Sequence, residues 1–137
     1  MIVVDTNIIV YLYLSGERSE QAQRLLRKDP QWAAPLLWRS EFRNVLALYL
    51  RKRLLDLHTA QAVMDEALAL MSGREYDVAS SAILTLASKS RCWAYDCEFV
   101  ALAQDLNVTL VTVDKQVVEQ FPDVAVSPER YLARRGR

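Results

Sequence analysis

Two aspartates directly follow predicted β-strands, and this position makes them the first candidates for chemistry. Asp5 comes after a buried apolar run at residues 2–4, and Asp114 comes after the apolar run at 109–113. In open α/β sheets, ligands bind beyond the carboxyl ends of the strands, so both side chains are expected on the functional edge of a sheet. The alternative for each is a helix N-cap or a turn, which are common positions for Asp.

Glu41 lies on a predicted helix, in line with apolar side chains. Leu37, Val45 and Leu48 are four, four and seven residues away from it and share its face of the helix. This stripe is predicted to face the sheet, where an unpaired carboxylate costs several kcal/mol. Glu41 therefore needs a counter-charge, a raised pKa or a metal ion. Asn44, three residues further on, is a candidate to orient Glu41 by a hydrogen bond.

Asp96 repeats this pattern at the predicted start of a helix. Phe99, Val100 and Ala103 lie three, four and seven residues after it, so Asp96 heads an apolar stripe. The alternative is a plain N-cap. The two roles are compatible, because a capping carboxylate keeps lone pairs for other partners. Glu98 is predicted to point away from this face, into solvent.

Several carboxylates gathered on one edge of a sheet repel one another, and some would bind protons unless a cation neutralises them. Oxygen ligands suit Mg²⁺ and Mn²⁺ better than Zn²⁺. Such a site can polarise a phosphodiester and activate a water for in-line attack. We therefore predict that the catalytic and metal-binding residues are Asp5, Glu41, Asp96 and Asp114, with Mg²⁺ or Mn²⁺ as the cofactor.

The composition narrows the alternatives. The chain has 137 residues, 52% hydrophobic and 25% charged, with 17 basic and 17 acidic residues, which predicts one globular domain over residues 1–137. His58 is the only histidine, so catalysis by a histidine pair is excluded. Cys92 and Cys97 are spaced neither as a zinc site nor as a redox motif, and we expect reduced thiols in a cytoplasmic protein. No apolar run is long enough for a membrane span, and the N-terminus has no signal-peptide pattern.

Strands and helices alternate along the chain. Strands are predicted at 2–4, 31–34, 75–78, 109–113 and around 124, and helices at 7–14, 19–28, 35–53, 59–71, 79–90, 96–106, 115–121 and from 128. His58 falls in a predicted polar linker before the helix at 59–71. The alternation predicts an α/β fold: a three-layer α/β/α sandwich with a mostly parallel central sheet.

Four segments in order resemble the PIN-domain ribonucleases, and most of all the VapC-type toxins of bacterial toxin–antitoxin pairs. The segments are Val4-Asp5-Thr6-Asn7, Ser40-Glu41-Phe42-Arg43-Asn44, the run 95–103 that contains Asp96, and Thr112-Val113-Asp114-Lys115. The resemblance covers essentially the whole chain. It implies a PIN-like fold and assigns the same four acids to the metal site.

The resemblance also implies partners and supporting residues. Thr6, Asn7 and Thr112 are expected in supporting polar roles, although ordinary capping explains Thr6 and Asn7 nearly as well. Members of the family cleave RNA endonucleolytically with magnesium or manganese. The toxins commonly form homodimers and are neutralised by a cognate antitoxin protein. Apolar residues spread around the predicted helix at 45–50 and continue at 54–55, which agrees with an interface.

Contacts with RNA are expected from local basic residues, because the net charge is zero. Arg39 and Arg43 lie close to Glu41 in the sequence and are the predicted RNA-binding pair. The alternative is that one of them forms a salt bridge with Glu41 at the edge of the helix.

The sequence leaves two rival functions open. The chain could be a catalytically silent PIN-fold RNA-binding or adaptor protein, which the four intact acids argue against. It could also be another metal enzyme, such as a DNA nuclease or a phosphatase. An aspartyl-phosphate phosphatase would have a second Asp shortly after Asp5, and Asn7 occupies that place.

Overall fold

The computed structural model describes residues 1–14 and 16–135. Within these residues the strands are β1 (Ile2–Val4), β2 (Trp32–Pro35), β3 (Glu75–Tyr76), β4 (Leu110–Val111) and β5 (Ala125–Val126). The helices in the same part of the chain are α1 (Thr6–Tyr13), α2 (Ser19–Lys28), α3 (Leu37–Arg51), α4 (Leu57–Met71), α5 (Ser80–Ser88), α6 (Ala94–Leu106), α7 (Lys115–Gln120) and α8 (Pro128–Ala133).

The described strands form a five-stranded sheet in the order β3-β2-β1-β4-β5, and every pair of neighbours is parallel. β1 is central, with Val3 paired to Ala33 on one side and to Leu110 on the other. Both of its faces are covered, which explains why residues 2–4 form an unbroken apolar run in place of an alternating one.

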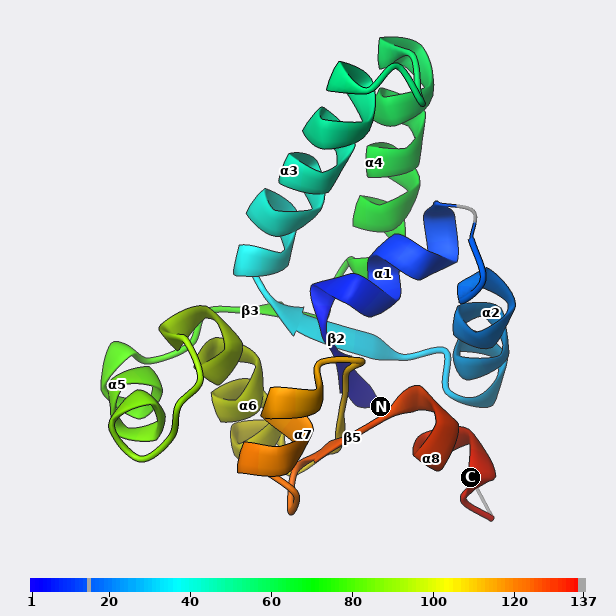
Figure 1. Ribbon diagram of the computed structural model, residues 1–137. Coiled ribbons are helices and arrows are strands. Elements are labelled where there is room, and N and C mark those ends of the chain that lie inside the picture. The colour runs from blue at the N-terminus through cyan, green and yellow to red at the C-terminus, as the bar shows by residue number, and fades with distance from the viewer. Residues whose placement is uncertain (15, 136–137) are drawn as a thin grey trace.

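Helices cover both faces of the sheet. Figure 1 shows α1, α3 and α4 on one face, α5 and α6 on the other, and the α3–α4 hairpin projecting beyond the sheet. α2 packs beside α1 and α8 at the edge. The prediction of a three-layer α/β/α sandwich with a parallel sheet is therefore confirmed, and its carboxyl edge positions the site described below.

Two predicted elements are shorter in the structure. The regular strand predicted at 109–113 is confined to Leu110 and Val111, because the chain turns toward the site at Thr112. The helix predicted at 35–53 spans only Leu37–Arg51. Pro35 ends β2, where it pairs with Tyr76, and Arg53 ends the hairpin's first helix in a left-handed conformation with φ 58°.

The starts of two helices also differ from the prediction. α4 begins at Leu57, because the carboxylate of Asp56 caps it by accepting a hydrogen bond from the Thr59 N–H at 2.7 Å. His58 is therefore an exposed residue of the first helical turn and does not lie in a linker. α6 begins at Ala94, two residues earlier than predicted, with Trp93 as its N-cap.

The remaining predicted bounds agree with the structure to within two residues, which is the usual uncertainty of helix and strand ends. Cys92 and Cys97 are buried, free thiols. None of the helices in the described part of the chain is long and apolar enough to span a membrane.

Candidate metal centre at the carboxyl edge of the sheet

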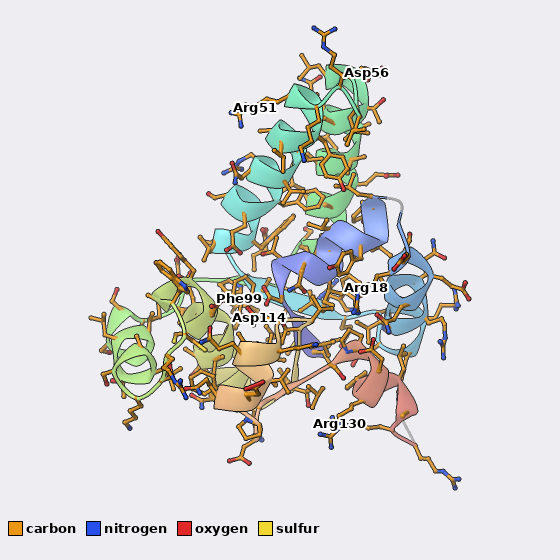
Figure 2. All side chains as sticks on the ribbon, in the orientation of Figure 1. Arg18, Arg51, Asp56, Phe99, Asp114 and Arg130 are labelled. Atoms are coloured by element: carbon orange, nitrogen blue, oxygen red, sulfur yellow. The ribbon has the colours of Figure 1, made fainter. Side chains whose placement is uncertain are left out.

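The four predicted acids lie in one pocket, which is the central geometric finding. The pocket has a volume of about 420 Å³ and lies between α1, α3, α6 and the segment that leads from β4 to α7. Figure 2 shows Asp114 near the middle of the molecule, where these elements meet. The polar residues that line the pocket are Asp5, Thr6, Asn7, Tyr11, Glu41, Asn44, Asp96 and Asp114.

Asp5 is held by two hydrogen bonds at the end of β1. Its Oδ1 accepts from the backbone N–H of Thr6 at 2.8 Å and so caps α1, while its Oδ2 accepts from the Thr112 hydroxyl at 2.7 Å. Burial raises the pKa of Asp5 to about 6, and the charges of Glu41 and Asp96 add to the rise, while the bond from Thr112 opposes it. Capping and a site role therefore coexist in this residue.

Glu41 reaches the pocket from α3. Its Oε1 accepts a hydrogen bond from the Thr6 hydroxyl at 2.6 Å. Burial raises the pKa of Glu41, and the nearby charges of Asp96 and Glu98 raise it further, against the effect of the Thr6 bond. The prediction that Asn44 orients Glu41 has no support in the contacts, since the Asn44 side chain makes no hydrogen bond with a described residue.

The predicted helix face of Glu41 was wrong by one residue. The buried stripe of α3 runs through Trp38, Phe42 and Leu46, whereas Leu48 is 45% exposed. Two large aromatic side chains take the core positions, because they bury more apolar area than Leu37 or Val45 would. This leaves Glu41 at the edge of the buried stripe, where its carboxylate faces the pocket.

Asp96 is the third residue of α6 and not its N-cap. The backbone N–H of Trp93 acts on its carboxylate from the N-cap position, three residues earlier, which is where a capping box places such an interaction. Burial raises the pKa of Asp96, as does the charge of Asp114, and the Trp93 bond lowers it. As predicted, Phe99, Val100 and Ala103 below it are buried.

Thr112 joins the end of β1 to the segment that leads from β4 to α7. Its hydroxyl donates to Asp5, and it accepts from the backbone N–H of Asp114 at 3.1 Å. It is fully buried. Asp114 in turn caps α7, accepting from the Gln116 N–H at 2.9 Å. A supporting position for Thr112 is thus visible in the geometry.

The donor set fits a hard cation. The carboxylates supply oxygen ligands of the type that Mg²⁺ and Mn²⁺ prefer. The Asn7 carbonyl oxygen Oδ1 is buried without a hydrogen-bond partner, and the Asn7 amide makes only a long contact of 3.5 Å to Thr112. Among the described residues, however, no three acidic, histidine or cysteine side chains are already close enough to form a finished metal site. The repulsion between like charges opposes their convergence.

Arg39 does not pair with Glu41. Its guanidinium donates two hydrogen bonds to Glu75, at 2.7 and 2.6 Å, and Trp38 donates a third to the same carboxylate at 2.7 Å. The predicted contact of Arg39 with RNA is untested, but its donors are largely engaged in joining α3 to β3. Arg43 is exposed and donates only to the Ser40 hydroxyl, at 3.3 Å.

Glu98 was missed by the sequence reasoning, which placed it in solvent. It is half-buried, and burial together with the charge of Asp77 raises its pKa. Its charge also acts on Glu41. The signal in the sequence was weak, because Glu98 lies two residues after Asp96 and so on a different helix face.

Comparisons with known proteins agree with this fold. The family model described as "PIN domain" matches residues 2–125. Ribonuclease VapC3 of Pyrobaculum aerophilum is 32% identical over 124 residues, which cover 88% of this chain and 95% of that protein. FitAcB from Neisseria gonorrhoeae has a TM-score of 0.75 at 19% identity, covering 94% of this chain and 99% of its own. A toxin–antitoxin complex from Klebsiella pneumoniae has a TM-score of 0.70 at 22% identity, covering 93% and 98%.

Proposed function

The chain belongs to the PIN domain family and is a nuclease of the VapC type, and from this premise we propose that it is a metal-dependent endoribonuclease and the toxin of a toxin–antitoxin pair. The observation that carries the proposal is the meeting of Asp5, Glu41, Asp96 and Asp114 in one pocket from four separate segments. RNA is the proposed substrate, Mg²⁺ or Mn²⁺ the proposed cofactor and the cytoplasm the proposed location.

Each acid has a role that its contacts support. Asp5, Asp96 and Asp114 would hold the cation, and Thr112 keeps the Asp5 carboxylate turned toward the pocket. Thr6 fixes one oxygen of Glu41, which leaves the other oxygen free to complete the site or to position the attacking water. A bound divalent cation would supply polarisation of the phosphodiester and activation of water.

Two proteins are proposed as partners. The first is a cognate antitoxin, which the likeness to a toxin–antitoxin complex supports. The second is another copy of this chain, because the projecting α3–α4 hairpin carries the exposed side chains of Leu48, Leu54 and Leu57. Figure 2 places Arg51 and Asp56 at the far tip of this hairpin. Light scattering on the chain alone tests the dimer, and Leu57→Glu is expected to shift it to a monomer.

The test of the activity compares the wild type with Asp96→Asn on total tRNA and a panel of structured RNAs, with Mg²⁺, with Mn²⁺ and with EDTA. The matched control is Asp105→Asn, the same substitution at an exposed position in the last turn of the same helix. We expect discrete, metal-dependent cleavage by the wild type and the control, and none by Asp96→Asn.

The result that overturns the proposal is equally plain. If the folded wild type, freed of any bound partner, cleaves no RNA under any of these conditions, the chain is better described as a silent RNA-binding or adaptor protein. If Asp96→Asn cleaves as well as the control does, the assignment of Asp96 is wrong.

A further inference from the structure

Two exposed aromatic side chains lie at the start of α6, within three residues of Asp96. Trp93 is 73% exposed and Tyr95 is 59% exposed, and they are the only aromatic residues among the large hydrophobic side chains that are exposed in the described part of the chain. The other tryptophans, Trp32 and Trp38, are fully buried. Single exposed apolar residues are ordinary on a protein surface. Two exposed aromatic side chains within three residues of a pocket acid call for a functional explanation.

The backbone holds these aromatic residues in a fixed position relative to Asp96. Trp93 is the N-cap residue of α6, and its carbonyl accepts a hydrogen bond from the Cys97 N–H at 3.1 Å. Tyr95 lies in the same first turn, directly before Asp96. A helix of 13 residues carries this turn, so the aromatic side chains do not sit on a loose loop.

Tyr95 forms one wall of a recess that adjoins the acidic pocket. The recess has a volume of about 250 Å³, and its other walls come from Leu37, Ser40, Glu41 and Asn44 of α3. Glu41 and Asn44 also line the acidic pocket, so the two hollows are neighbours that share these side chains. The recess therefore offers space for the next unit of a polymer that is bound across the acids.

The recess offers polar groups as well as a ring. The Asn44 amide is exposed and makes no hydrogen bond with any described residue. The Ser40 hydroxyl accepts from Arg43 at 3.3 Å, which brings a guanidinium to the rim. These groups match the parts of a nucleotide. An aromatic face stacks on the base, a free amide bonds to the edge of the base, and a nearby cation attracts the phosphate.

We propose that this recess is a nucleobase subsite, in which an unpaired base next to the cleaved phosphodiester stacks on Tyr95 while Asn44 reads the edge of the base. The inference rests on the proposed ribonuclease function and deepens it. A base can lie on the ring only when it has left its own duplex, so the subsite selects RNA that is single-stranded at the cleavage position.

The residues that the recess shares with the acidic pocket favour RNA over a protein as the occupant. A protein partner has no need for its contact surface to share Glu41 and Asn44 with a metal site, whereas a polymer that is cut at the acids has further units that lie beside them. Capture of a partner protein by Tyr95 is thus an outcome that the experiment has to separate from RNA binding.

The first experiment measures binding without cleavage. A fluorescein-labelled single-stranded RNA of mixed sequence and a duplex of the same sequence are titrated with protein in EDTA, and anisotropy reports the affinity. Tyr95→Ala is expected to weaken single-strand binding by roughly five-fold or more, the loss typical for one stacked base. Tyr95→Phe keeps the ring and should bind as the wild type does. Leu84→Ala, which removes an exposed apolar side chain on the neighbouring helix α5 and touches neither hollow, is the control.

The second experiment measures selectivity with metal present. Sequencing of the ends produced from total tRNA gives the base preference beside the cut. Asn44→Ala should flatten this preference, and Tyr95→Ala should raise KM more than it lowers kcat. A role limited to folding would not move base preference, and thermal melting of each variant checks the fold directly.

The outcomes separate the two ideas. If the wild type cleaves RNA but Tyr95→Ala binds, cleaves and selects as the wild type does, the subsite is refuted and the proposed function stands. If Tyr95→Ala loses only the binding of a partner protein, the subsite is likewise refuted. If the wild type neither binds nor cleaves RNA with Mg²⁺ or Mn²⁺, the wild-type result alone refutes the proposed function, and the subsite is refuted with it.

Discussion

Replacing Asp5 by Asn is expected to make the protein more stable at neutral pH while abolishing its activity. Burial raises the pKa of Asp5 from 3.8 to about 6, so the folded state holds the proton more tightly than the unfolded state. Ionisation of Asp5 therefore disfavours folding. The penalty is absent below the unfolded pKa, grows as the pH rises toward the folded pKa, and is complete above it.

The magnitude follows from the size of this shift. A change of about 2 pKa units at 1.36 kcal/mol each gives a penalty of about 3 kcal/mol at pH 7. This is an upper limit, because Asp5 is open to the pocket on one side. Asn keeps only one acceptor for the donors of Thr6 and Thr112, and losing one such bond costs about 1 kcal/mol. The net stabilisation of Asp5→Asn is thus about 1–2 kcal/mol at neutral pH.

The assay is urea unfolding of the wild type and Asp5→Asn in EDTA, at about pH 7 and at about pH 4, with Asp105→Asn as the exposed control. The stability gain should appear at the higher pH and disappear, or change sign, at the lower one. Adding Mg²⁺ or Mn²⁺ should reverse the order at neutral pH, because an ion that binds only the folded wild type stabilises it by mass action.

A variant that is less stable than the wild type in EDTA at neutral pH would refute this reasoning. It would mean that the two hydrogen bonds to the carboxylate outweigh its burial and the charges around it. Equal stabilisation of the wild type and Asp5→Asn by the metal would instead remove Asp5 from the set of metal ligands.

Three further predictions follow from the contacts around the site. Arg39→Ala should lower the midpoint of thermal or urea denaturation, because the mostly buried Glu75 loses its charged partner and keeps only the bond from Trp38, and an unchanged midpoint would contradict the structural role. Arg43→Ala should leave stability unchanged and reduce the salt dependence of single-stranded RNA binding by roughly 0.7 in the log–log slope, whereas an equal slope in both proteins would exclude a phosphate contact. Thr6→Val should lower kcat roughly 10- to 100-fold in an RNA cleavage assay by releasing one oxygen of Glu41, while Thr6→Ser, which keeps the hydroxyl, should not.

The strand-end acids could be predicted because their cause is local. An apolar run followed by Asp marks the end of a buried strand, and parallel strands bring such ends to one edge. Asp5 and Asp114 both meet this rule, and the structure joins them through the buried hydroxyl of Thr112. The layers of the fold were predictable for the same reason, since the alternation of strand and helix permits few arrangements.

The face of a helix is harder to predict when apolar residues surround it. On α3 the stripe through Leu37 and Glu41 and the stripe through Trp38 and Phe42 are both apolar, and sequence periodicity does not rank them. Packing against the sheet decides in favour of the larger aromatic side chains. The predicted buried face of α3 is wrong by one residue, but one residue corresponds to only part of a helical turn. Glu41 therefore still lies close enough to the sheet to reach the pocket.

The sequence does not predict hydrogen bonds between side chains that are far apart along the chain. Arg39 and Glu75 are 36 residues apart, and the bidentate bond between them depends on β3 lying beside β2. The same holds for the bond between Thr6 and Glu41, which are 35 residues apart. The sequence position of Arg39 therefore predicts a contact with RNA, while the fold gives its guanidinium a structural partner.

The arrangement of charges explains why neutral hydroxyls, and not basic side chains, hold these acids. Among the described residues the ion pairs involve Asp29, Glu75 and Glu129, and none involves an acid of the pocket. An arginine or lysine in the pocket would hold the carboxylates in place but would also compete with a cation for them. Thr6 and Thr112 orient two carboxylates without adding a charge, so the repulsion between the acids is left for a bound ion to relieve.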